Sequence, residues 1–444
     1  MIKFLKELYP GPRYLLGMAA IVLLLIIFYV MGSPTGLGWI VLAMVLIYNI
    51  WEISILFANG SGIEGHREMA ERFSNGDQNE IKIKILSLYN KAVRIELIDE
   101  LPFVFQIRNL HHTTLLNPGE SHTWVYYLKP VRRGKYEFGS TLVFIEWGLG
   151  LWQRRINLNN KTSVSVYPSF LQMSKYELLA FGNHTSEKGL KKLPMRGVGL
   201  EFDQIKKFAL GDDIRQINWR STARHGEVMV NRYTEEKSQN IYQCIDKGRL
   251  MQFPFDNMYL LDYAINAALM LSNIVLKKGD KAGLICFDNK VSTHLPASRS
   301  RSMLHSILEH LYHIDTDFNN ADHENLTLWT LSKLNQRSLI FLYTYFVNFE
   351  SFQRKEKHLY SLSRKHLIIV IIFKNTGLDD LIKQKSKTIR DVYEQVLAEQ
   401  QWVEQQHIQK RLRTLGIECI LTTPETLNVD SLNKYLELKA LGKI

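Results

Sequence analysis

The sequence has few of the features that identify a secreted protein or a cofactor-binding enzyme. Its three cysteines, Cys244, Cys286 and Cys419, lie far apart within apolar runs, and no C-x-x-C pair occurs. This spacing argues against a disulfide framework and a zinc site, and it indicates buried thiols in a reducing compartment. A glycine-rich phosphate loop is also missing, because the G-x-G at 197–199 lacks a third glycine and a strand before it. We therefore expect no cofactor.

Charge is absent from residues 14–51, which contain no Asp, Glu, Lys, Arg or His. The run is too long for one span, and it is interrupted at 32–36 by Gly-Ser-Pro-Thr-Gly, a sequence that favours a turn. Each half is long enough to cross about 30 Å of hydrocarbon. A cleaved signal peptide fits poorly, because no small-x-small site is present and a second span follows at once. Residues 1–62 therefore predict a transmembrane hairpin with spans at about 14–31 and 37–57.

Positive residues flank this hairpin on both sides, whereas its turn has none. Lys3, Lys6 and Arg13 precede it, and Arg67 and Arg72 follow it. The positive-inside rule then predicts a multi-pass protein of the bacterial inner (plasma) membrane with both termini in the cytoplasm. The formal net charge of +11 fits a position beside an anionic leaflet. We expect no nucleic-acid partner, because acids are interleaved with the basic residues and no stacking motif is visible.

Residues 63–170 show short alternating segments separated by turn signals. The clearest alternation is Glu-Ile-Lys-Ile-Lys-Ile at 80–85, and turn sequences stand at 74–77, 117–120 and 132–135. Several strands at this spacing predict an antiparallel, all-β sandwich. The adjacent pair His111 and His112 would point to opposite faces of a strand, so we interpret them as surface residues and not as a metal pair.

Residues 240–444 alternate uniformly apolar strands with amphipathic helices. The predicted strands are 240–246, 282–288, 338–346, 366–373 and 418–422, and the predicted helices are 258–278, 300–312, 349–364, 387–415 and 430–441. Such a pattern predicts an α/β region with a doubly wound, mostly parallel sheet covered on both faces. Ligands bind such sheets at the carboxyl ends of the strands, which here are Asp246, Asp288 and the 345–348 neighbourhood.

The linking segment, 171–239, contains the most unusual composition of the chain. Its stretch from Arg196 to Glu236 gathers glycines, paired acids, arginines and an Asn-Trp pair, and it follows neither a helical nor a strand period. With these residues in view, the chain resembles the bacterial domain-of-unknown-function-58 family. The resemblance rests on R-G-x-G-x-E-F at 196–202, G-D-D-x-R-x-I-N-W at 211–219 and S-T-A-R at 221–224. The signature residues carried over are Arg196, Gly197, Gly199, Glu201, Phe202, Gly211, Asp212, Asp213, Arg215, Asn218, Trp219, Ser221, Ala223 and Arg224.

The resemblance covers essentially the whole chain and implies a von Willebrand factor A-like domain at residues 240–444. It also implies a MoxR-type AAA+ ATPase as partner. That fold commonly binds a divalent ion through a D-x-S-x-S loop, whose equivalent here is Asp246-Lys247-Gly248-Arg249-Leu250. Gly248 and Leu250 replace both serines and two cations are added, so we expect no metal at this degenerate loop. We leave open whether Lys247 tethers Asp246 and whether Thr327 supplies a remaining hydroxyl.

Three interpretations of the signature segment compete. In a structural one, Asp212 or Asp213 caps a turn or helix, Arg215 and Arg224 pair with acids, and Trp219 anchors the segment on a sheet. In the second, arginine and tryptophan form a protein-docking surface, since both residue types dominate interface hot spots. In the third, its acids serve a membrane-bound hydrolase, although no nucleophile–base pair is evident and no catalytic residue is assigned. We favour a non-enzymatic, membrane-anchored cytoplasmic scaffold or adaptor and keep the hydrolase as the alternative.

Overall fold

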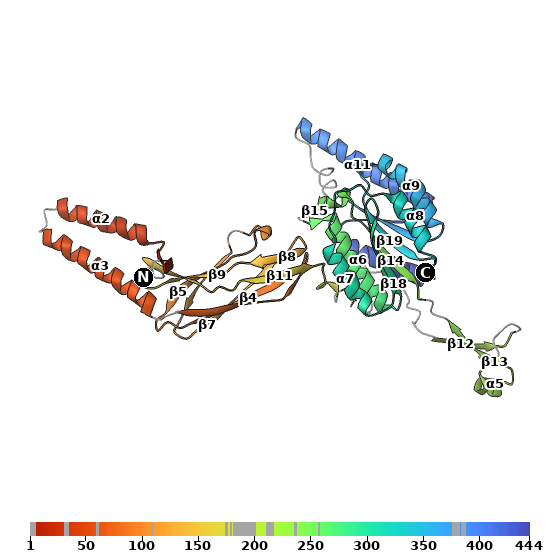
Figure 1. The fold of residues 1–444 in the computed structure, drawn as a ribbon, viewed down its shortest axis with the longest axis horizontal. Helices are drawn as coiled ribbons and strands as arrows, with labels where there is room; N and C mark the ends of the chain where they lie inside the picture. Colours follow the sequence, from red (N-terminus) through yellow and green to blue (C-terminus); the bar gives the residue numbers. More distant parts are fainter. Residues whose placement is uncertain are drawn as a thin grey trace. The chain divides into compact units, whose positions relative to one another are not determined.

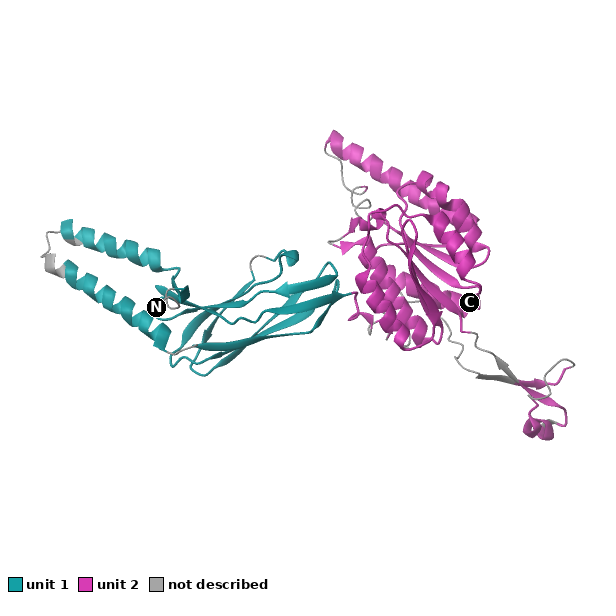
Figure 2. Ribbon diagram, in the orientation of Figure 1, with its two compact units in different colours: residues 1–167 teal, residues 168–444 magenta. Residues whose placement is uncertain are grey.

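The computed structural model describes residues 6–30, 35–58, 62–107, 110–173, 176–177, 180, 201–209, 217–234, 238–255, 258–374, 382 and 388–444. The chain divides into two compact units, residues 1–167 and 168–444 (Figure 2). Each unit has its own apolar core, and each is described separately below.

The uncharged N-terminal run forms two helices, α2 (Tyr14–Val30) and α3 (Thr35–Ala58) (Figure 1). Residues Gly38–Ala58 of α3 are long and apolar enough to cross a bilayer, and α2 adds a shorter apolar run over Tyr14–Ile27. Apolar side chains on both helices are exposed, among them Leu23 and Ile47. Helix α6 (Leu260–Lys277) is also long and apolar enough to cross a bilayer. Its side chains are almost all buried in the second unit, however, so core packing explains its apolar character.

The strands of the first unit share one core, as the layers of a sandwich do. They are β1 (Leu8–Pro10), β2 (Ile63–Met69), β3 (Arg72–Ser74), β4 (Asn79–Ser87), β5 (Val93–Asp99), β6 (His111–Leu116), β7 (Ser121–Leu128), β8 (Gly134–Phe138), β9 (Thr141–Glu146), β10 (Trp152–Asn157) and β11 (Thr162–Tyr167), with a short 3-10 turn, η1, at Phe103–Phe105. The sheet orders are β1-β10-β9-β5-β6, β2-β4-β7 and β3-β11-β8. Ile83 on β4, Ile95 on β5, Val143 on β9 and Val164 on β11 are buried in the same cluster. The predicted alternation is therefore real: every second residue of β4 is buried.

One sequence interpretation in this unit needs correction. Arg67 does not supply a free flanking charge, because its side chain is fully buried and paired with the carboxylate of Asp99. His111 is exposed and the neighbouring His112 is partly exposed. Nε2 of His112 lies 3.0 Å from Nε2 of His122, with the two rings stacked. Among the described residues, no group of three His, Cys, Asp or Glu side chains is arranged to hold a metal ion.

The second unit is an α/β region whose six-stranded sheet has the order β18-β17-β14-β19-β20-β21. Its strands are β14 (Asn240–Asp246), β17 (Lys281–Phe287), β18 (Val291–Ser298), β19 (Leu339–Thr344), β20 (Leu367–Phe373) and β21 (Glu418–Thr422). All neighbouring strands pair in parallel except β18, which runs antiparallel to β17. A short hairpin, β15 (Pro254–Phe255) and β16 (Met258–Tyr259), precedes α6.

Helices cover both faces of this sheet, as the uniformly apolar strands predicted. One face packs against α6, α7 (Ser302–His313) and α12 (Leu427–Ala440). The other packs against α8 (His323–Lys333), α9 (Phe349–Ser363) and α11 (Ile389–Thr414). Successive residues of β14 show the alternation, since Ile241 belongs to the first core and Tyr242 to the second. The three cysteines are free thiols, and burial raises the pKa of Cys419 to about 12.

Candidate functional site

The described part of the signature segment folds into a small hairpin with a helix between its strands. Strand β12 (Glu201–Lys207) pairs antiparallel with β13 (Met229–Thr234), and α5 (Trp219–His225) lies between them in sequence. Gly226 ends α5 in the left-handed conformation, with φ at 68°, and its N–H donates to the carbonyl of Thr222. Glycine suits this position because the conformation strains other residues.

Asn218 and Thr222 hold the helix on the hairpin. The Asn218 side chain caps α5 by accepting the Ser221 N–H at 3.0 Å, and its amide nitrogen donates to Oδ1 of Asn231 at 2.9 Å. Oγ1 of Thr222 donates to the Asn218 carbonyl and accepts the N–H of Met229. Asn218 and Ser221, two residues of the signature, thus act in the backbone framework of α5. Capping by Asp212 or Asp213 concerns residues outside the described part of the chain.

Trp219 does not anchor this helix on a sheet. Its side chain is 70% exposed, and Ala223 and Arg224 on the same helix are exposed as well. Among the residues that the structure describes, no carboxylate forms an ion pair with Arg224. Glu201 and Phe202 lie on β12, while Arg196, Gly197, Gly199, Gly211, Asp212, Asp213 and Arg215 lie outside the described residues. The described half of the signature therefore combines a fixed backbone with an exposed tryptophan and arginine.

A second cluster lies at the carboxyl end of the parallel sheet, where β14 and β19 are neighbours. The chain leaves β14 toward β17 on one side, and β19 lies on the other side. This is the topological switch point at which α/β sheets bind ligands. We call Asp246, Lys247, Asp288, Asp317 and Thr344 the switch-point cluster.

Asp246 is buried and held by two hydrogen bonds. Its Oδ2 accepts from Oγ1 of Thr344 at 2.7 Å, and its Oδ1 accepts from the N–H of Gly248 at 2.8 Å. Burial raises the pKa of Asp246, and these two hydrogen bonds and the charge of Lys355 oppose that shift. Thr344 is the last residue of β19, and it gives the cluster a hydroxyl donor.

Lys247 links the other two carboxylates of the cluster. Its Nζ lies 2.8 Å from Oδ2 of Asp317 and 3.3 Å from Oδ2 of Asp288. Burial lowers the pKa of Lys247, but the hydrogen bond to Asp317 and the charge of Asp288 outweigh it, so the pKa is raised. Burial likewise works against ionisation of Asp288, yet the Lys290 N–H and the Lys247 charge hold its pKa below the ordinary value. The ammonium group therefore neutralises acids from two different loops.

The structure answers two questions that the sequence left open for this loop. Lys247 does not tether Asp246, because its Nζ pairs with Asp288 and Asp317. Thr327 supplies no hydroxyl to the cluster, since its Oγ1 donates to the carbonyl of His358 at 3.3 Å. Besides Thr344, which contacts Asp246, Thr316 supplies a hydroxyl to the loop and donates to the Lys247 carbonyl at 2.7 Å.

The replacements at Gly248 and Leu250 also have structural reasons. A Cβ atom at 248 would lie 3.0 Å from the Ala321 nitrogen and 3.0 Å from Oδ1 of Asp246, so a serine there would require these neighbours to move by a few tenths of an ångström. Leu250 is partly buried against the core. Neither position presents an oxygen toward Asp246.

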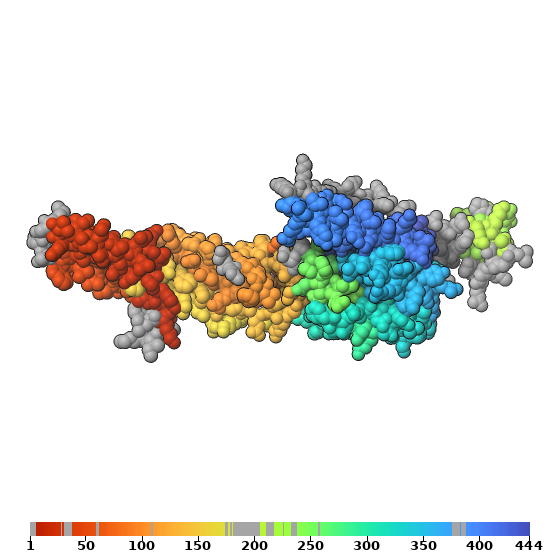
Figure 3. Space-filling view, turned by 90° about the horizontal axis from the view of Figure 1, so that it is seen from above, coloured from red at the N-terminus to blue at the C-terminus, as the bar shows by residue number. Residues whose placement is uncertain are grey.

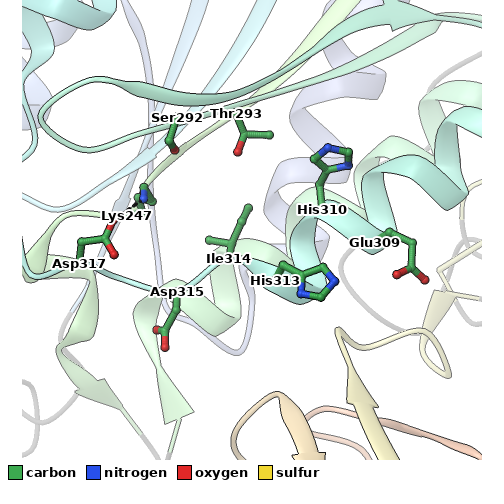
Figure 4. A pocket seen from close by; sticks show the side chains of 9 residues that line it. All are labelled: Lys247, Ser292, Thr293, Glu309, His310, His313, Ile314, Asp315 and Asp317. Atoms are coloured by element: carbon green, nitrogen blue, oxygen red, sulfur yellow. Dashed lines mark hydrogen bonds and ion pairs between the residues drawn. The ribbon is translucent and has the colours of Figure 1, made fainter.

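A cavity of about 370 Å³ opens beside the cluster (Figure 4). It lies between β18, the C-terminal end of α7 and the loop that follows α7. Its lining comprises Lys247, Ser292, Thr293, Glu309, His310, His313, Ile314, Asp315 and Asp317. Sequence reasoning missed Asp317 because it lies in a loop that has no periodicity.

We predict that millimolar Mg²⁺, Ca²⁺ or Mn²⁺ leaves the melting temperature of the second unit unchanged. The Lys247 ammonium neutralises Asp288 and Asp317, and Gly248 and Leu250 offer no side-chain oxygen. A metal at 100 times its dissociation constant would stabilise the native state by about 2.7 kcal/mol. Thermal unfolding of the full chain with each ion, and with a chelator, measures this. A metal-dependent rise that disappears in Asp246→Ala would refute the prediction.

Comparisons with known proteins bear on the second unit. Residues 204–400 match the family model described as "Protein of unknown function DUF58". An uncharacterized protein of Bacillus subtilis (strain 168), YeaD, is 24% identical over 191 residues, which are 43% of this chain and 45% of that protein. The match thus spans less than half of that relative. These matches confirm the resemblance to the domain-of-unknown-function-58 family over residues 204–400.

Solved structures are similar to part of the chain. A conserved hypothetical protein, BatB, from Bacteroides thetaiotaomicron is 13% identical, with coverage of 46% of this chain and 98% of that one and a TM-score of 0.29. The CARDB domain of the PF1109 protein from Pyrococcus furiosus is also 13% identical, with coverage of 24% and 94% and a TM-score of 0.18. These likenesses are too distant to indicate a function.

Proposed function

We propose that this chain, with its region of the domain-of-unknown-function-58 family, is a membrane-anchored scaffold that docks a protein partner in the cytoplasm. In this proposal α2 and α3 cross the inner membrane as a hairpin, and both termini lie on the cytoplasmic side. The long apolar run of α3 and the exposed apolar side chains of both helices support the anchor. Lys6 and Arg13 before the hairpin and Arg72 after it support the orientation, whereas the buried Arg67 contributes no free charge.

The second unit is proposed to be a von Willebrand factor A-like domain that works without a metal. The strand order, with one antiparallel edge strand and helices on both faces, supports this assignment. So does the buried Asp246 at the switch point, which occupies the first position of an adhesion-type loop. The ion pairs of Lys247 with Asp288 and Asp317 support a domain that works without a metal ion.

The exposed Trp219 side chain is the observation on which the docking proposal rests. An indole that is 70% exposed on a helix with a fixed backbone belongs to the residue type most enriched in interface hot spots. Exposed Arg220 and Arg224 on the same helix add donors of the kind found in interface hot spots. We propose a MoxR-type AAA+ ATPase as the partner, on the strength of the family resemblance.

The test is capture of a purified MoxR-type ATPase of the same organism by the full chain in detergent or membranes. Trp219→Ala is expected to weaken binding by about thirtyfold, which corresponds to the roughly 2 kcal/mol typical of a hot-spot tryptophan. Phe103→Ala, which removes a similarly exposed ring from the first unit, is the matched control. Equal binding by both variants would rule out α5 as the docking surface, and no binding by the wild type would rule out this partner.

A further inference from the structure

The loop between β9 and β10, residues 147–151, is held at the ends of the two apolar helices. Figure 3 shows the hairpin, in red, in contact with the β-rich part of the same unit. The carbonyl of Leu151 accepts the N–H of Gly11 at 2.8 Å, just before α2. From α3, the Tyr48 hydroxyl accepts the Leu149 N–H at 2.9 Å. The loop therefore contacts α3 and the segment just before α2 through its backbone.

Glu52 strengthens this attachment at the point where the uncharged run ends. Its Oε1 accepts the N–H groups of Gly150 and Leu151 at 3.0 and 3.1 Å. Asn49, one turn earlier, accepts the indole N–H of Trp152 at 2.6 Å. Glu52 is the first charged side chain of α3, so the uncharged part of the helix ends at Trp51. If that uncharged part spans the bilayer, the loop lies near the depth of the lipid headgroups.

Aromatic rings and one lysine form a surface cluster at this depth. The rings of Trp51 and Trp147 meet edge to face with centroids 4.8 Å apart. Nζ of Lys91 lies 5.2 Å from the first ring centroid and 4.8 Å from the second. Lys91 is exposed, and among the described residues no carboxylate forms an ion pair with it. Leu149, on the same loop, exposes 56% of its surface.

We propose that Lys91, held over the rings of Trp51 and Trp147, binds the phosphate of an anionic phospholipid, such as phosphatidylglycerol, in the cytoplasmic leaflet. Tryptophan concentrates at the membrane–water interface, and a lysine there is attracted to anionic lipid. The Lys91 ammonium lies over the two indole faces, so it disfavours a quaternary amine on those faces and selects against choline headgroups. Leu149 then contacts the acyl boundary. This inference rests on the proposed membrane anchoring.

The experiment measures lipid retained by the full chain. The protein is reconstituted in mixed phosphatidylglycerol and phosphatidylcholine, extracted in mild detergent, and analysed by native mass spectrometry. Lys91→Gln is expected to reduce the retained ratio of phosphatidylglycerol to phosphatidylcholine by about fivefold, the effect of one basic group near the surface. Lys91→Arg keeps the charge and is expected to keep most of the selectivity. The matched control is Lys129→Gln. Lys129 is also exposed, but it follows β7, which pairs antiparallel with β4, so it lies at the end of this strand pair opposite to Lys91.

The outcomes separate this site from the anchor. A chain that stays in membranes during alkaline carbonate extraction, but whose lipid ratio is unaffected by Lys91→Gln, would overturn the lipid site alone. A chain released by carbonate would overturn the membrane anchoring and the lipid site with it. A loss of selectivity that is equal in Lys91→Gln and Lys129→Gln would show nonspecific attraction and would also overturn the site.

Discussion

Replacing Arg67 with methionine is expected to lower the free energy of unfolding of the first unit by about 3 to 5 kcal/mol, the usual loss when one partner of a buried ion pair is removed. Nε of Arg67 donates to Oδ2 of Asp99 at 3.1 Å, and a second guanidinium nitrogen contacts Oδ1. Neither side chain has any solvent exposure. The variant would leave the Asp99 carboxylate buried beside only the hydroxyls of Tyr126 and Thr141.

The large loss follows from how completely the guanidinium group is satisfied. Besides Asp99, it donates to the carbonyl oxygens of Asn160 at 2.9 Å and Gly139 at 3.0 Å. These groups come from the loops after β10 and β8, so Arg67 joins segments that are distant in sequence. In the variant these partly buried carbonyls would also lose a donor, which adds to the cost.

Amide hydrogen exchange of the full chain is the appropriate measurement, because it reports the opening of individual strands without assuming a single transition. Protection of the β4 and β5 amides is expected to fall in Arg67→Met. Arg94→Met, at an exposed position on β5, should leave protection nearly unchanged. Equal protection of the two variants would show that Arg67 is not essential to the sandwich.

Arg67 also shows where sequence reasoning stopped. Arg67 follows the hairpin closely in sequence, so it was counted among the positive charges that set the membrane orientation. Only its ion pair with Asp99 on β5 shows that the charge is buried. The alternation in β4 and the uniformly apolar strands of the second sheet were readable, because one-face and two-face burial produce different patterns. Strand β18 escaped prediction because its side chains are mostly only partly buried. Helix α8 was also not predicted, because few of its residues are both apolar and buried and its N-cap, Asp322, follows an irregular loop.

The position of the switch-point cluster could be predicted from the sequence, but the ion pairs within it could not. A buried strand ending in an acid identified Asp246 and Asp288, since the ends of parallel strands share one edge of the sheet. Which acid Lys247 contacts depends on the course of the loop that carries Asp317, and no periodic pattern encodes such a loop. The signature hairpin was missed for a related reason: caps and side-chain bonds around Asn218 and Thr222 hold it together, with little apolar alternation.

The second large effect is expected at the cluster itself. Lys247→Met should lower the stability of the second unit at neutral pH by about 3 kcal/mol, at the low end for a broken buried pair because Asp317 is largely exposed. The buried Asp288 would keep its charge with only the Lys290 N–H and the Asn319 amide as donors. Protection of the β14 and β17 amides in the full chain measures the loss. Lys290→Met, an exposed lysine on the adjacent turn, is the matched control.

The pH dependence distinguishes electrostatic loss from lost packing. In the wild type the folded-state pKa of Asp288 lies below its ordinary value of 3.8, so its contribution is present above that value and is lost as the pH falls through the folded pKa. Because Lys247 contributes to this depression, the difference between wild type and Lys247→Met should be largest above about pH 4 and should shrink below it. A difference that persists unchanged at pH 3 would assign the loss to the packing of the lysine stem. In that case the charge of the ammonium group would not be what stabilises this edge of the sheet.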